Sequence, residues 1–598
     1  MDSIAVIDFG SQYAHLIANR VRRLQVYAEI FLPETPLHVF SKYKGIILSG
    51  GPNSVYEKGA PTINPKIFSL GIPILGLCYG HQLIAHLLGG KVEPGQTKEY
   101  GLAKLSVLKK VGIFDNLRDH TQVWMSHGDT VTALPKDFIH LGKTPDCFYS
   151  AMGNPARKIF SAQFHIEVTH TVDGMKMLSN FLDICHAKRE WSMERFMEEK
   201  ITSIKKMLGD RKVFLLVSGG VDSAVAYAML SKALGTDRVY GLFVDTGFLR
   251  KNEGKKIAAA LRKIGVKNFH VFSAKKRFFS ALRGVINPEE KRKIIGDLFL
   301  EVQAQAVRKL KLDPEHWVLG QGTIYPDTIE SAGTKYADKI KTHHNRVPEI
   351  LELIKKGRVI EPLAELYKDE VRKLGTQLGL PDSMVWKHPF PGPGLAVRIL
   401  CADAEKLPEN TSAAEENIET FLMPHRLSGK ILPIQSVGVQ GDARTYRNPL
   451  AVWGENINFD EFENLSTALT NRFQVINRVC LLLAPQKIHS IKILPGVLTE
   501  KRVHLLQELD DIVMTFIQKN HIERDTWQFP TILLPLSING IKREAVMLRP
   551  VCSEEAMTAN FYKMDFMLLK KLVAKLAPKV SAVFYDITNK PPGTIEWE

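Results

Sequence analysis

The residues best suited to covalent chemistry are a cysteine and a histidine in the first third of the chain. Cys78 lies in PILGLCYGHQLIAHLL, between an apolar run and a helical stretch, with Gly76 and Gly80 on either side. A sharp strand-to-helix turn exposes a nucleophile at the end of a sheet, and the helix N-terminus favours the attacking thiolate. His165, in QFHIEV, can act as base and acid for that thiol. The pattern predicts nucleophilic catalysis by Cys78.

Glu167 is the carboxylate that we expect to orient His165. The two residues are two apart in a segment that reads as a strand, so both side chains leave the same face. The carboxylate can then fix the tautomer of the imidazole. Gly50 and Gly51, after the apolar run GIILS, can offer backbone N–H groups to a developing oxyanion. A packing thiol and a core histidine are the alternative for either residue taken alone, but the three elements arrive together and in order.

A second candidate site is the glycine turn SGGVDS. The β-branched run VFLLV precedes it and the helical stretch AVAYAMLSKALG follows it. A strand that feeds a glycine turn at a helix N-terminus presents free N–H groups and the positive end of a dipole, which suit phosphate. It is not a Walker A loop, because no Gly-Lys-Ser/Thr follows. The residues expected to bind phosphate are Ser218, Gly219, Gly220, Val221, Asp222 and Ser223.

Downstream segments carry groups suited to the remaining parts of a nucleotide whose phosphates would bind this turn. The strand VYGLFVD ends at Asp245, where it suits the nucleoside end. Asp327 and Glu330 lie one helical turn apart, and two such carboxylates repel unless a cation lies between them. Mg²⁺ is the natural candidate, with Asp222 as a further ligand, and acids at an ordinary helix N-terminus are the alternative. The other residues expected at this site are Val244, Gly322, Lys341, His343 and His344.

Short apolar runs alternate with helical stretches over the first two thirds of the chain, which predicts α/β architecture with mostly parallel sheets. IAVIDFG, GIILSGG, PILGLC and IFSAQFH read as strands of one domain, and VFLLV, VYGLFVD, NFHVFSA and HWVLGQG as strands of a second. WKHPFPGPGLAVR is too rich in Pro and Gly for a regular element and reads as a loop or lid. The last 200 residues show a faint duplication of strand, strand, helix, strand. We expect domains at 1–187, 188–399 and 400–598, the last one α+β with two repeated subdomains.

Composition narrows the class of protein. Of 598 residues, 45% are hydrophobic and 24% charged, as in ordinary globular proteins. No apolar run approaches the roughly 20 residues that span a bilayer, and MDSIAVIDFG lacks the basic start of a signal peptide. Six cysteines without paired spacing argue for a reducing compartment. We expect a cytoplasmic protein with no membrane or nucleic-acid partner, in which the net charge of +15 reflects a solvated basic surface together with sites for anionic nucleotides.

The motifs SGGPNSV, GLCYGHQ and QFHIEV resemble class I glutamine amidotransferases over about residues 1–185. That resemblance implies that the Cys-His-Glu triad hydrolyses the amide of L-glutamine to ammonia. One departure is Ile166, where the family usually has proline; its side chain should point away from both neighbours. The resemblance also implies a glutamine pocket formed by Gly50, Gly51, Tyr79, Gln82, Ser126, His127, Gly128 and Asp129.

SGGVDS resembles the loop of the N-type ATP pyrophosphatases, whose sheet is a doubly wound, adenine-nucleotide α-hydrolase-like (PP-loop) fold. With QGTIYPDTIES, KTHHN, HPFPGPGLAVR and KPPGTIEWE, nearly the whole chain is similar to the glutamine-hydrolysing GMP synthase family. The resemblance implies that ATP adenylylates the C2 oxygen of XMP with release of pyrophosphate, and that ammonia then displaces AMP to give GMP. By matching motif positions it implies an XMP site formed by Arg277, Asp442, Lys590 and Glu596.

Other interpretations of the sequence stay open at this point. A PP-loop enzyme that modifies tRNA would carry a tRNA-binding appendage and a sulfur-carrying cysteine pair. A scaffold that has lost activity would have no need of an intact triad and phosphate loop. KPPGTIEWE reads equally as a docked clamp or as a frayed tail. Because the C-terminal part looks doubled where the shorter family pattern has one dimerisation unit, we favour a monomer over a homodimer.

Overall fold

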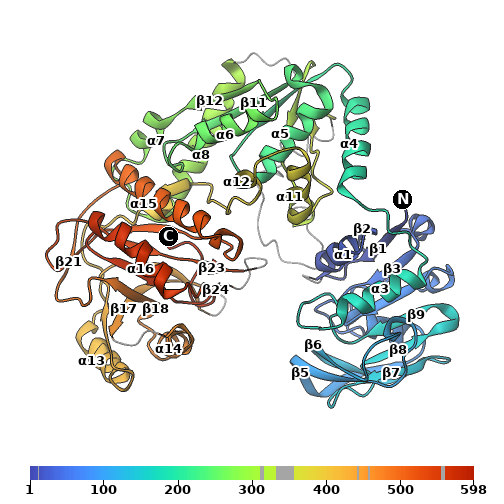
Figure 1. The fold of residues 1–598 in the computed structure, drawn as a ribbon. Coiled ribbons are helices and arrows are strands. Elements are labelled where there is room, and N and C mark those ends of the chain that lie inside the picture. Colours follow the sequence, from blue (N-terminus) through green and yellow to red (C-terminus); the bar gives the residue numbers. More distant parts are fainter. Residues whose placement is uncertain (11–12, 310–314, 331–355, 441–442, 455–457, 554–558) are drawn as a thin grey trace. The chain divides into compact units, whose positions relative to one another are not determined.

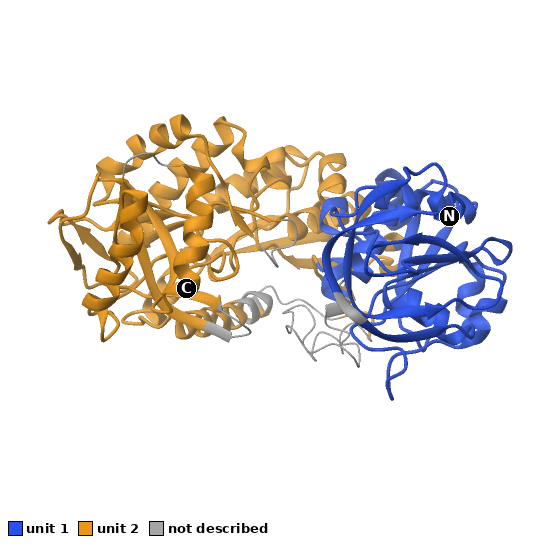
Figure 2. Cartoon of the chain, turned by 90° about the horizontal axis from the view of Figure 1, so that it is seen from below, with its two compact units in different colours: residues 1–203, 323–355, 363–370 blue, residues 204–322, 356–362, 371–598 orange. Residues whose placement is uncertain are grey.

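The structure is a computed structural model that describes the chain except for residues 11–12, 310–314, 331–355, 441–442, 455–457 and 554–558. Its contacts divide the chain into two compact units (Figure 2). Unit 1 comprises Met1–Ser203, Thr323–Lys355 and Leu363–Glu370, and unit 2 comprises Ile204–Gly322, Lys356–Pro362 and Val371–Glu598. The domain boundaries expected at residues 187 and 399 stay a prediction. No helix among the described residues is long and apolar enough to cross a membrane.

Unit 1 is built on a nine-stranded sheet with the order β2-β1-β3-β4-β9-β8-β7-β5-β6. Its parallel part contains β1 (Ser3–Ile7), β2 (Tyr27–Phe31), β3 (Gly45–Leu48), β4 (Ile74–Leu77) and β9 (Ile159–Ala162). The strands expected from sequence are confirmed here, because apolar runs buried on both faces are typical of parallel strands. The antiparallel part was not expected and contains β5 (Lys91–Val107), β6 (His120–Ala133), β7 (Ile139–Lys143) and β8 (Ala151–Asn154).

Of the helices described in unit 1, α1 (Ala14–Arg23) and α2 (Tyr79–Leu87) pack directly on this sheet. The others are α3 (Gly174–Ile184), the start of α4 (Met193–Leu208) and α9 (Tyr325–Glu330). The polar segment expected to be helical after residue 188 is confirmed as α4. α1 buries Ala14, Ile17, Ala18 and Val21 in the same apolar core as strands β1 and β4.

Arg22 of α1 joins segments of unit 1 that are more than 300 residues apart. Its buried guanidinium forms an ion pair with Glu370 at 3.1 Å. Four aromatic rings surround it at 4.6–5.5 Å: those of Tyr27, Trp191, Tyr325 and Tyr367. Trp191 also donates a hydrogen bond to Glu370 at 2.8 Å. Cation–π contacts of a desolvated arginine are each worth about 2 kcal/mol, so this cluster holds residues 323–330 and 363–370 in the unit.

Unit 2 begins with a five-stranded parallel sheet of order β12-β11-β10-β13-β14. The strands are β10 (Lys212–Leu216), β11 (Val239–Asp245), β12 (Phe269–Ser273), β13 (Trp317–Gly320) and β14 (Val359–Ile360), and all but β14 were expected. The order reverses between β10 and β13, where α/β sheets bind ligands beyond the strand C-termini. The helices described in this part of unit 2 are α5 (Val221–Leu234), α6 (Glu253–Lys263), α7 (Lys275–Ala281), α8 (Pro288–Lys309), part of α11 (Lys368–Gln377) and α12 (Asp382–Val385).

The C-terminal sheet of unit 2 contains the expected duplication, except that the first strand of its first repeat ends at the first residue of ILPIQSVGVQGD, the segment in which the sequence pattern placed that strand. Its main path runs β15-β17-β18-β25-β22-β20, with β16 (Ser436–Gln440) paired to β17. One repeat contains α13 (Thr411–Leu422), β15 (Leu427–Ile431), β17 (Ala443–Gly454), α14 (Phe459–Arg472) and β18 (Ile476–Ala484). The other contains α15 (Glu500–Lys519), β20 (Thr531–Leu534), β22 (Ala545–Leu548), α16 (Phe566–Leu576) and β25 (Val583–Asp586). In each repeat the first two strands pair antiparallel and the last pair is parallel.

The two repeats meet where β18 pairs antiparallel with β25, which gives the sheet an approximate two-fold arrangement. Figure 1 shows α15 and α16 side by side over this sheet. Four short strands form two separate pairs: β19 (Ile491–Ile493) with β21 (Leu536–Ile538), and β23 (Val551–Cys552) with β24 (Asn560–Phe561). The Pro- and Gly-rich segment expected as a loop or lid ends in a 3₁₀ helix, Gly394–Arg398, which is fully buried. Those five residues therefore belong to the core, and the lid interpretation does not apply to them.

Candidate active sites

Cys78 occupies a strained turn between β4 and α2. Its backbone has φ 50° and ψ −103°, a region that costs a non-glycine residue about 1–3 kcal/mol. A Cβ at Gly76 would lie 2.5 Å from the Gly80 carbonyl oxygen, and one at Gly80 would lie 2.4 Å from that of Leu48. Both glycines are therefore required for the close contact of helix and strand at this turn. The elbow predicted from their spacing is present.

The structure brings Cys78, His165 and Glu167 together. His165 Nδ1 lies 2.7 Å from Glu167 Oε1, and both side chains are buried. Burial lowers the pKa of His165, but the Glu167 carboxylate and a hydrogen bond with Cys78 outweigh burial and hold that pKa well above 6.5. The imidazole is thus poised to carry a proton next to the sulfur.

The prediction that a strand extends over QFHIEV is wrong, because the observed strand ends before this motif. β9 ends at Ala162, so His165 and Glu167 lie in the bends that follow it. Long-range contacts hold these bends: His165 N donates to the Trp124 carbonyl at 3.1 Å, and Arg20 Nε donates to the Glu167 carbonyl at 3.0 Å. Ile166 is buried in the apolar core of unit 1, as its expected direction away from the triad requires.

Three neighbours of the triad were not expected from sequence. The ring of Tyr13 lies 4.6 Å from that of His165, Gln163 Nε2 donates to Cys78 Sγ at 3.8 Å, and Arg20 holds the backbone of Glu167. Gln163 sits inside the QFHIEV motif and was within reach of motif reasoning. Arg20 lies on α1 and Tyr13 directly precedes that helix. No local sequence pattern connects either residue with the triad.

Several of the residues expected in the glutamine pocket contact Cys78 or one another, and the role of the set stays a prediction. Gln82 Nε2 donates to the Asp129 carbonyl at 2.9 Å, and Cys78 Sγ donates to the Ser126 carbonyl at 3.6 Å. Tyr79 is buried beneath Gly51, where an added Cβ would lie 3.1 Å from the ring. Gly50 adjoins this pair, and its carbonyl accepts a hydrogen bond from the Ser49 hydroxyl at 2.8 Å. Gly128 lies on β6 between His127 and Asp129, and the imidazole of His127 contacts Glu99.

The glycine turn at 218–223 lies at the reversal point of the unit 2 sheet. Gly219 has φ 83°, and Gly220 caps the N-terminus of α5 without a side-chain cap. A Cβ at Gly322, after β13, would lie 2.9 Å from the backbone of Ser223, so this glycine allows β13 to approach the turn. Lys387 Nζ, which sequence reasoning missed, donates to the Gly219 carbonyl at 2.8 Å and pairs with Glu253.

The other residues expected at the ATP site belong to different parts of the chain, and some of them lie outside the described residues. Val244 and Asp245 end β11, and Asp245 forms an ion pair with Lys275 at 3.3 Å. Asp327 belongs to unit 1, where its carboxylate accepts a hydrogen bond from Ile324 N at 3.1 Å at the start of α9. An acid at the third position of a helix that accepts from the backbone N–H before the helix is one half of a capping box. The side chain of Glu330 and all of Lys341, His343, His344 and Asp442 lie outside the described residues.

The C-terminal segment KPPGTIEWE is docked, not frayed. Glu596 accepts two hydrogen bonds from the buried Arg398, at 2.7 and 3.0 Å. Trp597 is fully buried and donates to Asp586 at 2.9 Å. Lys291 forms a buried ion pair with Glu598 at 2.7 Å. The clamp interpretation therefore holds for the last residues of the chain.

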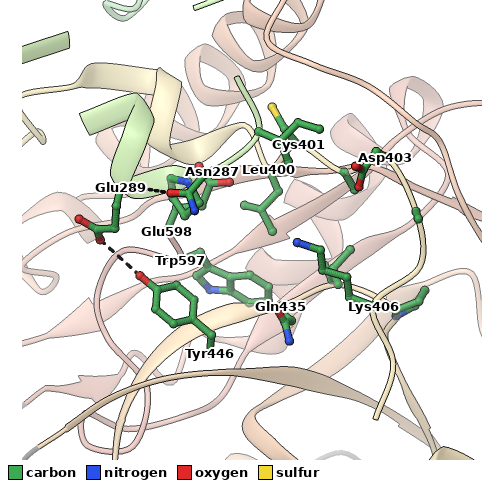
Figure 3. Close-up of a pocket in the computed structure, with 16 residues that line it drawn as sticks. Asn287, Glu289, Leu400, Cys401, Asp403, Lys406, Gln435, Tyr446, Trp597 and Glu598 are labelled. Atoms are coloured by element: carbon green, nitrogen blue, oxygen red, sulfur yellow. Dashed lines mark hydrogen bonds between the residues drawn. The ribbon is translucent and has the colours of Figure 1, made fainter. Parts of the chain in front are cut away.

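Arg277, another residue expected to bind XMP, lies on α7 and bonds to Glu301 and Gln305 of α8. Lys590 exchanges backbone hydrogen bonds with Ala559. A pocket of ≈ 520 Å³ lies beside the docked tail (Figure 3). Tyr446 points toward Glu289 at its edge, and their oxygen atoms are 3.3 Å apart. Of the residues expected to bind XMP, the three that the structure describes, Arg277, Lys590 and Glu596, do not line this pocket.

Comparison with known proteins decides the family. The chain is 47% identical over 605 residues to a probable glutamine-hydrolyzing GMP synthase of Leptospira interrogans, covering 100% of this chain and 99% of the relative. The chain belongs to the glutamine-hydrolysing GMP synthase family. It is 38% identical to the GMP synthase of Carboxydothermus hydrogenoformans, over 100% of this chain and 99% of that one. The resemblance drawn from the motifs is confirmed, and the enzyme is a glutamine-dependent ligase.

Three family models match separate parts of this GMP synthase family member. They describe glutamine amidotransferase class-I at residues 5–185, NAD synthase at 192–292 and the GMP synthase C terminal domain at 515–597. The third match falls on the second repeat of the C-terminal sheet. A GMP synthase of Aquifex aeolicus is 42% identical over 500 residues, which cover 80% of this chain and 96% of the relative. This chain is thus longer than that relative.

Proposed function

We propose that this chain makes GMP from XMP with ammonia that it releases from L-glutamine, at the expense of ATP, which leaves as AMP and pyrophosphate. The observation that carries the proposal is the assembly of Cys78, His165 and Glu167 at a strained elbow, in one chain with a glycine turn at the reversal point of a parallel sheet. One constellation supports ammonia release and the other supports the use of ATP.

In the glutaminase reaction, the Cys78 thiolate attacks the amide carbon of glutamine, and His165 protonates the departing ammonia. Water then attacks the thioester, with His165 as base, and releases glutamate. Glu167 holds the imidazole in one tautomer and stabilises its charged form through the 2.7 Å contact. Gly50 and Gly51, together with the helix N-terminus at Tyr79, are the proposed donors to the oxyanion.

In the ligase reaction, the C2 oxygen of XMP attacks the α-phosphorus of ATP, and pyrophosphate leaves into the turn at 218–223. The first turn of α5 supplies backbone donors and a positive dipole end to that leaving group. Mg²⁺, when bound, would neutralise charge on the phosphates. Among the carboxylates that the structure describes, we propose that Asp222, in the first turn of α5, holds the ion. The carboxylate of Asp327 instead accepts a hydrogen bond at the start of α9.

For XMP, we propose that Lys590 and Arg277 bind the 5′-phosphate and that Glu596 accepts from ribose hydroxyls or base N–H groups. The bidentate contact from Arg398 fixes the orientation of the Glu596 carboxylate. Asp442 is included in this proposed site only because its position matches the family motif. Arg398 is a positioning residue.

We also propose that the chain acts as a monomer. The support is that two repeats of one chain pair through β18 and β25. Light scattering on the purified protein tests this: a mass near 67.3 kDa is expected, and twice that mass would contradict it.

The decisive assay incubates the purified protein with XMP, ATP, Mg²⁺ and glutamine and follows GMP, AMP and pyrophosphate. Equal amounts of the three products are expected, and the absence of GMP would sink the proposal. Cys78→Ala should abolish turnover with glutamine but keep turnover with ammonium, because the thiol serves only to release ammonia. Loss of both would mean that Cys78 has a structural role instead.

A further inference from the structure

Three side chains of metal-ligating type meet on the antiparallel part of the unit 1 sheet. Glu99 lies on β5, His127 lies directly opposite it on β6, and Cys147 lies between β7 and β8. One ligand atom from each lies within 4.8 Å of the other two. Glu99 Oε2 and His127 Nε2 are 3.3 Å apart, and their side chains are 10% and 4% exposed. The cluster is therefore compact and largely shielded from water.

The hydrogen bonds of His127 direct a lone pair into this cluster. Its Nδ1 lies 2.9 Å from the Asp129 carbonyl oxygen, which can only accept, so Nδ1 carries the proton. Nε2 of the neutral ring is then an acceptor, and it has no hydrogen-bond partner although it is buried. It faces a carboxylate oxygen, another acceptor. Two acceptors at this distance repel each other unless a cation or a proton lies between them.

The remaining contacts orient the other two ligands. Thr144 Oγ1 donates to Glu99 Oε2 at 3.2 Å and accepts from Cys147 N at 3.0 Å. Thr130 Oγ1 lies 3.4 Å from Cys147 Sγ. A histidine whose second nitrogen donates to a carbonyl, beside a carboxylate held by a hydroxyl, is the usual surrounding of protein metal ligands. Burial raises the pKa of the Cys147 thiol, which a bound cation would counteract.

We propose that Glu99, His127 and Cys147 form a three-ligand site for Zn²⁺. Ligand atoms about 2.0–2.3 Å from a tetrahedral zinc ion are about 3.3–3.6 Å apart, close to the observed Glu99–His127 separation. Mixed sulfur, nitrogen and oxygen donors favour zinc over Mg²⁺ and Ca²⁺, which prefer oxygen alone. The fourth position falls to water.

The site adjoins the glutamine pocket through the backbone of β6. The residue before His127 is Ser126, whose carbonyl accepts from Cys78 Sγ, and the Asp129 carbonyl accepts from both His127 and Gln82. Zinc at His127 therefore braces the segment that lines one side of the pocket. This function goes beyond the proposed reaction and does not depend on it.

Cobalt provides the test, because a Co²⁺–thiolate bond gives a charge-transfer absorption that oxygen and nitrogen ligands do not. The full-length Cys78→Ala protein is titrated with Co²⁺, which removes the catalytic thiol as a competing ligand. We expect one Co²⁺ per chain, the charge-transfer band and four-coordinate d–d bands, all displaced by one equivalent of Zn²⁺. Absence of the band in this protein would overturn the proposal.

Two further variants in the same background identify the ligands. Adding Cys147→Ser should abolish the charge-transfer band, whereas adding Cys552→Ser, a half-buried cysteine of unit 2, should leave it unchanged. Adding Glu99→Gln should keep the band but weaken Co²⁺ affinity at least about 10-fold, which separates ligation from misfolding. A band that persists without Cys147, or an affinity unchanged by Glu99→Gln, would refute the site.

Discussion

Replacing Glu167 by glutamine should slow glutamine hydrolysis roughly 10- to 150-fold. The substitution keeps the size of the side chain but removes the charge 2.7 Å from His165 Nδ1. Both groups are buried, so water screens the contact little. A hydrogen bond to a charged group contributes about 1.5–3 kcal/mol, and each 1.36 kcal/mol is tenfold in rate. An amide N–H turned toward Nδ1 would also favour the wrong tautomer, so the lower figure is a minimum.

The same substitution should move the alkaline limb of the glutaminase pH profile toward lower pH. Burial lowers the pKa of His165, but Glu167 and Cys78 raise it by a larger amount. The pKa of His165 therefore lies well above 6.5. The imidazolium that protonates ammonia therefore persists to a higher pH in the native enzyme. Without the carboxylate the pKa of His165 falls, and the imidazolium is lost at a lower pH.

The assay measures glutamate release and, separately, GMP formation with ammonium chloride, each across a pH series. Glutamate release should fall and its alkaline limb should shift, while GMP formation from ammonium stays within about twofold of the native rate. The reasoning is refuted if glutamate release is unchanged, or if the alkaline limb stays in place or moves to higher pH. A Glu167→Asp variant, which keeps the charge on a shorter side chain, should retain the alkaline limb of the native profile.

Three further predictions concern other parts of the molecule. Asp222→Ala, in the first turn of α5, should abolish GMP formation from both glutamine and ammonium; GMP formation at the native rate would remove Asp222 from the proposed site. Arg398→Lys, which replaces a bidentate contact to Glu596, should raise KM for XMP about 10-fold in steady-state kinetics with ammonium, and an unchanged KM would contradict the positioning role. Arg22→Leu leaves the Glu370 carboxylate buried without its cation and should destabilise unit 1 by about 3–5 kcal/mol, measured by hydrogen exchange of its slowest amides. The control Arg23→Leu, whose ion pair with Asp369 is partly exposed, should cost at most about 1 kcal/mol, and equal effects of the two variants would contradict the prediction.

Sequence alone determined the parts of this protein whose geometry depends on neighbouring residues. The elbow at Cys78 follows from Gly76 and Gly80, because their missing side chains allow α2 to contact β3 and β4. The turn at 218–223 follows from a strand, two glycines and a helix in succession. Hydrophobic runs likewise predicted the parallel strands, since a strand buried on both faces needs apolar residues at every position.

Tertiary structure decided the contacts between residues that are far apart in the chain. Arg398 with Glu596, Arg22 with Glu370, and Glu99 with His127 and Cys147 are brought together by sheet pairing and core packing. No local pattern encodes such contacts, because each partner alone reads as an ordinary polar residue. β5 and β6 were missed because strands with one open face carry polar residues that weaken the apolar signal. The sequence therefore established which chemistry the chain performs, and the fold decided which side chains hold the reacting groups in place.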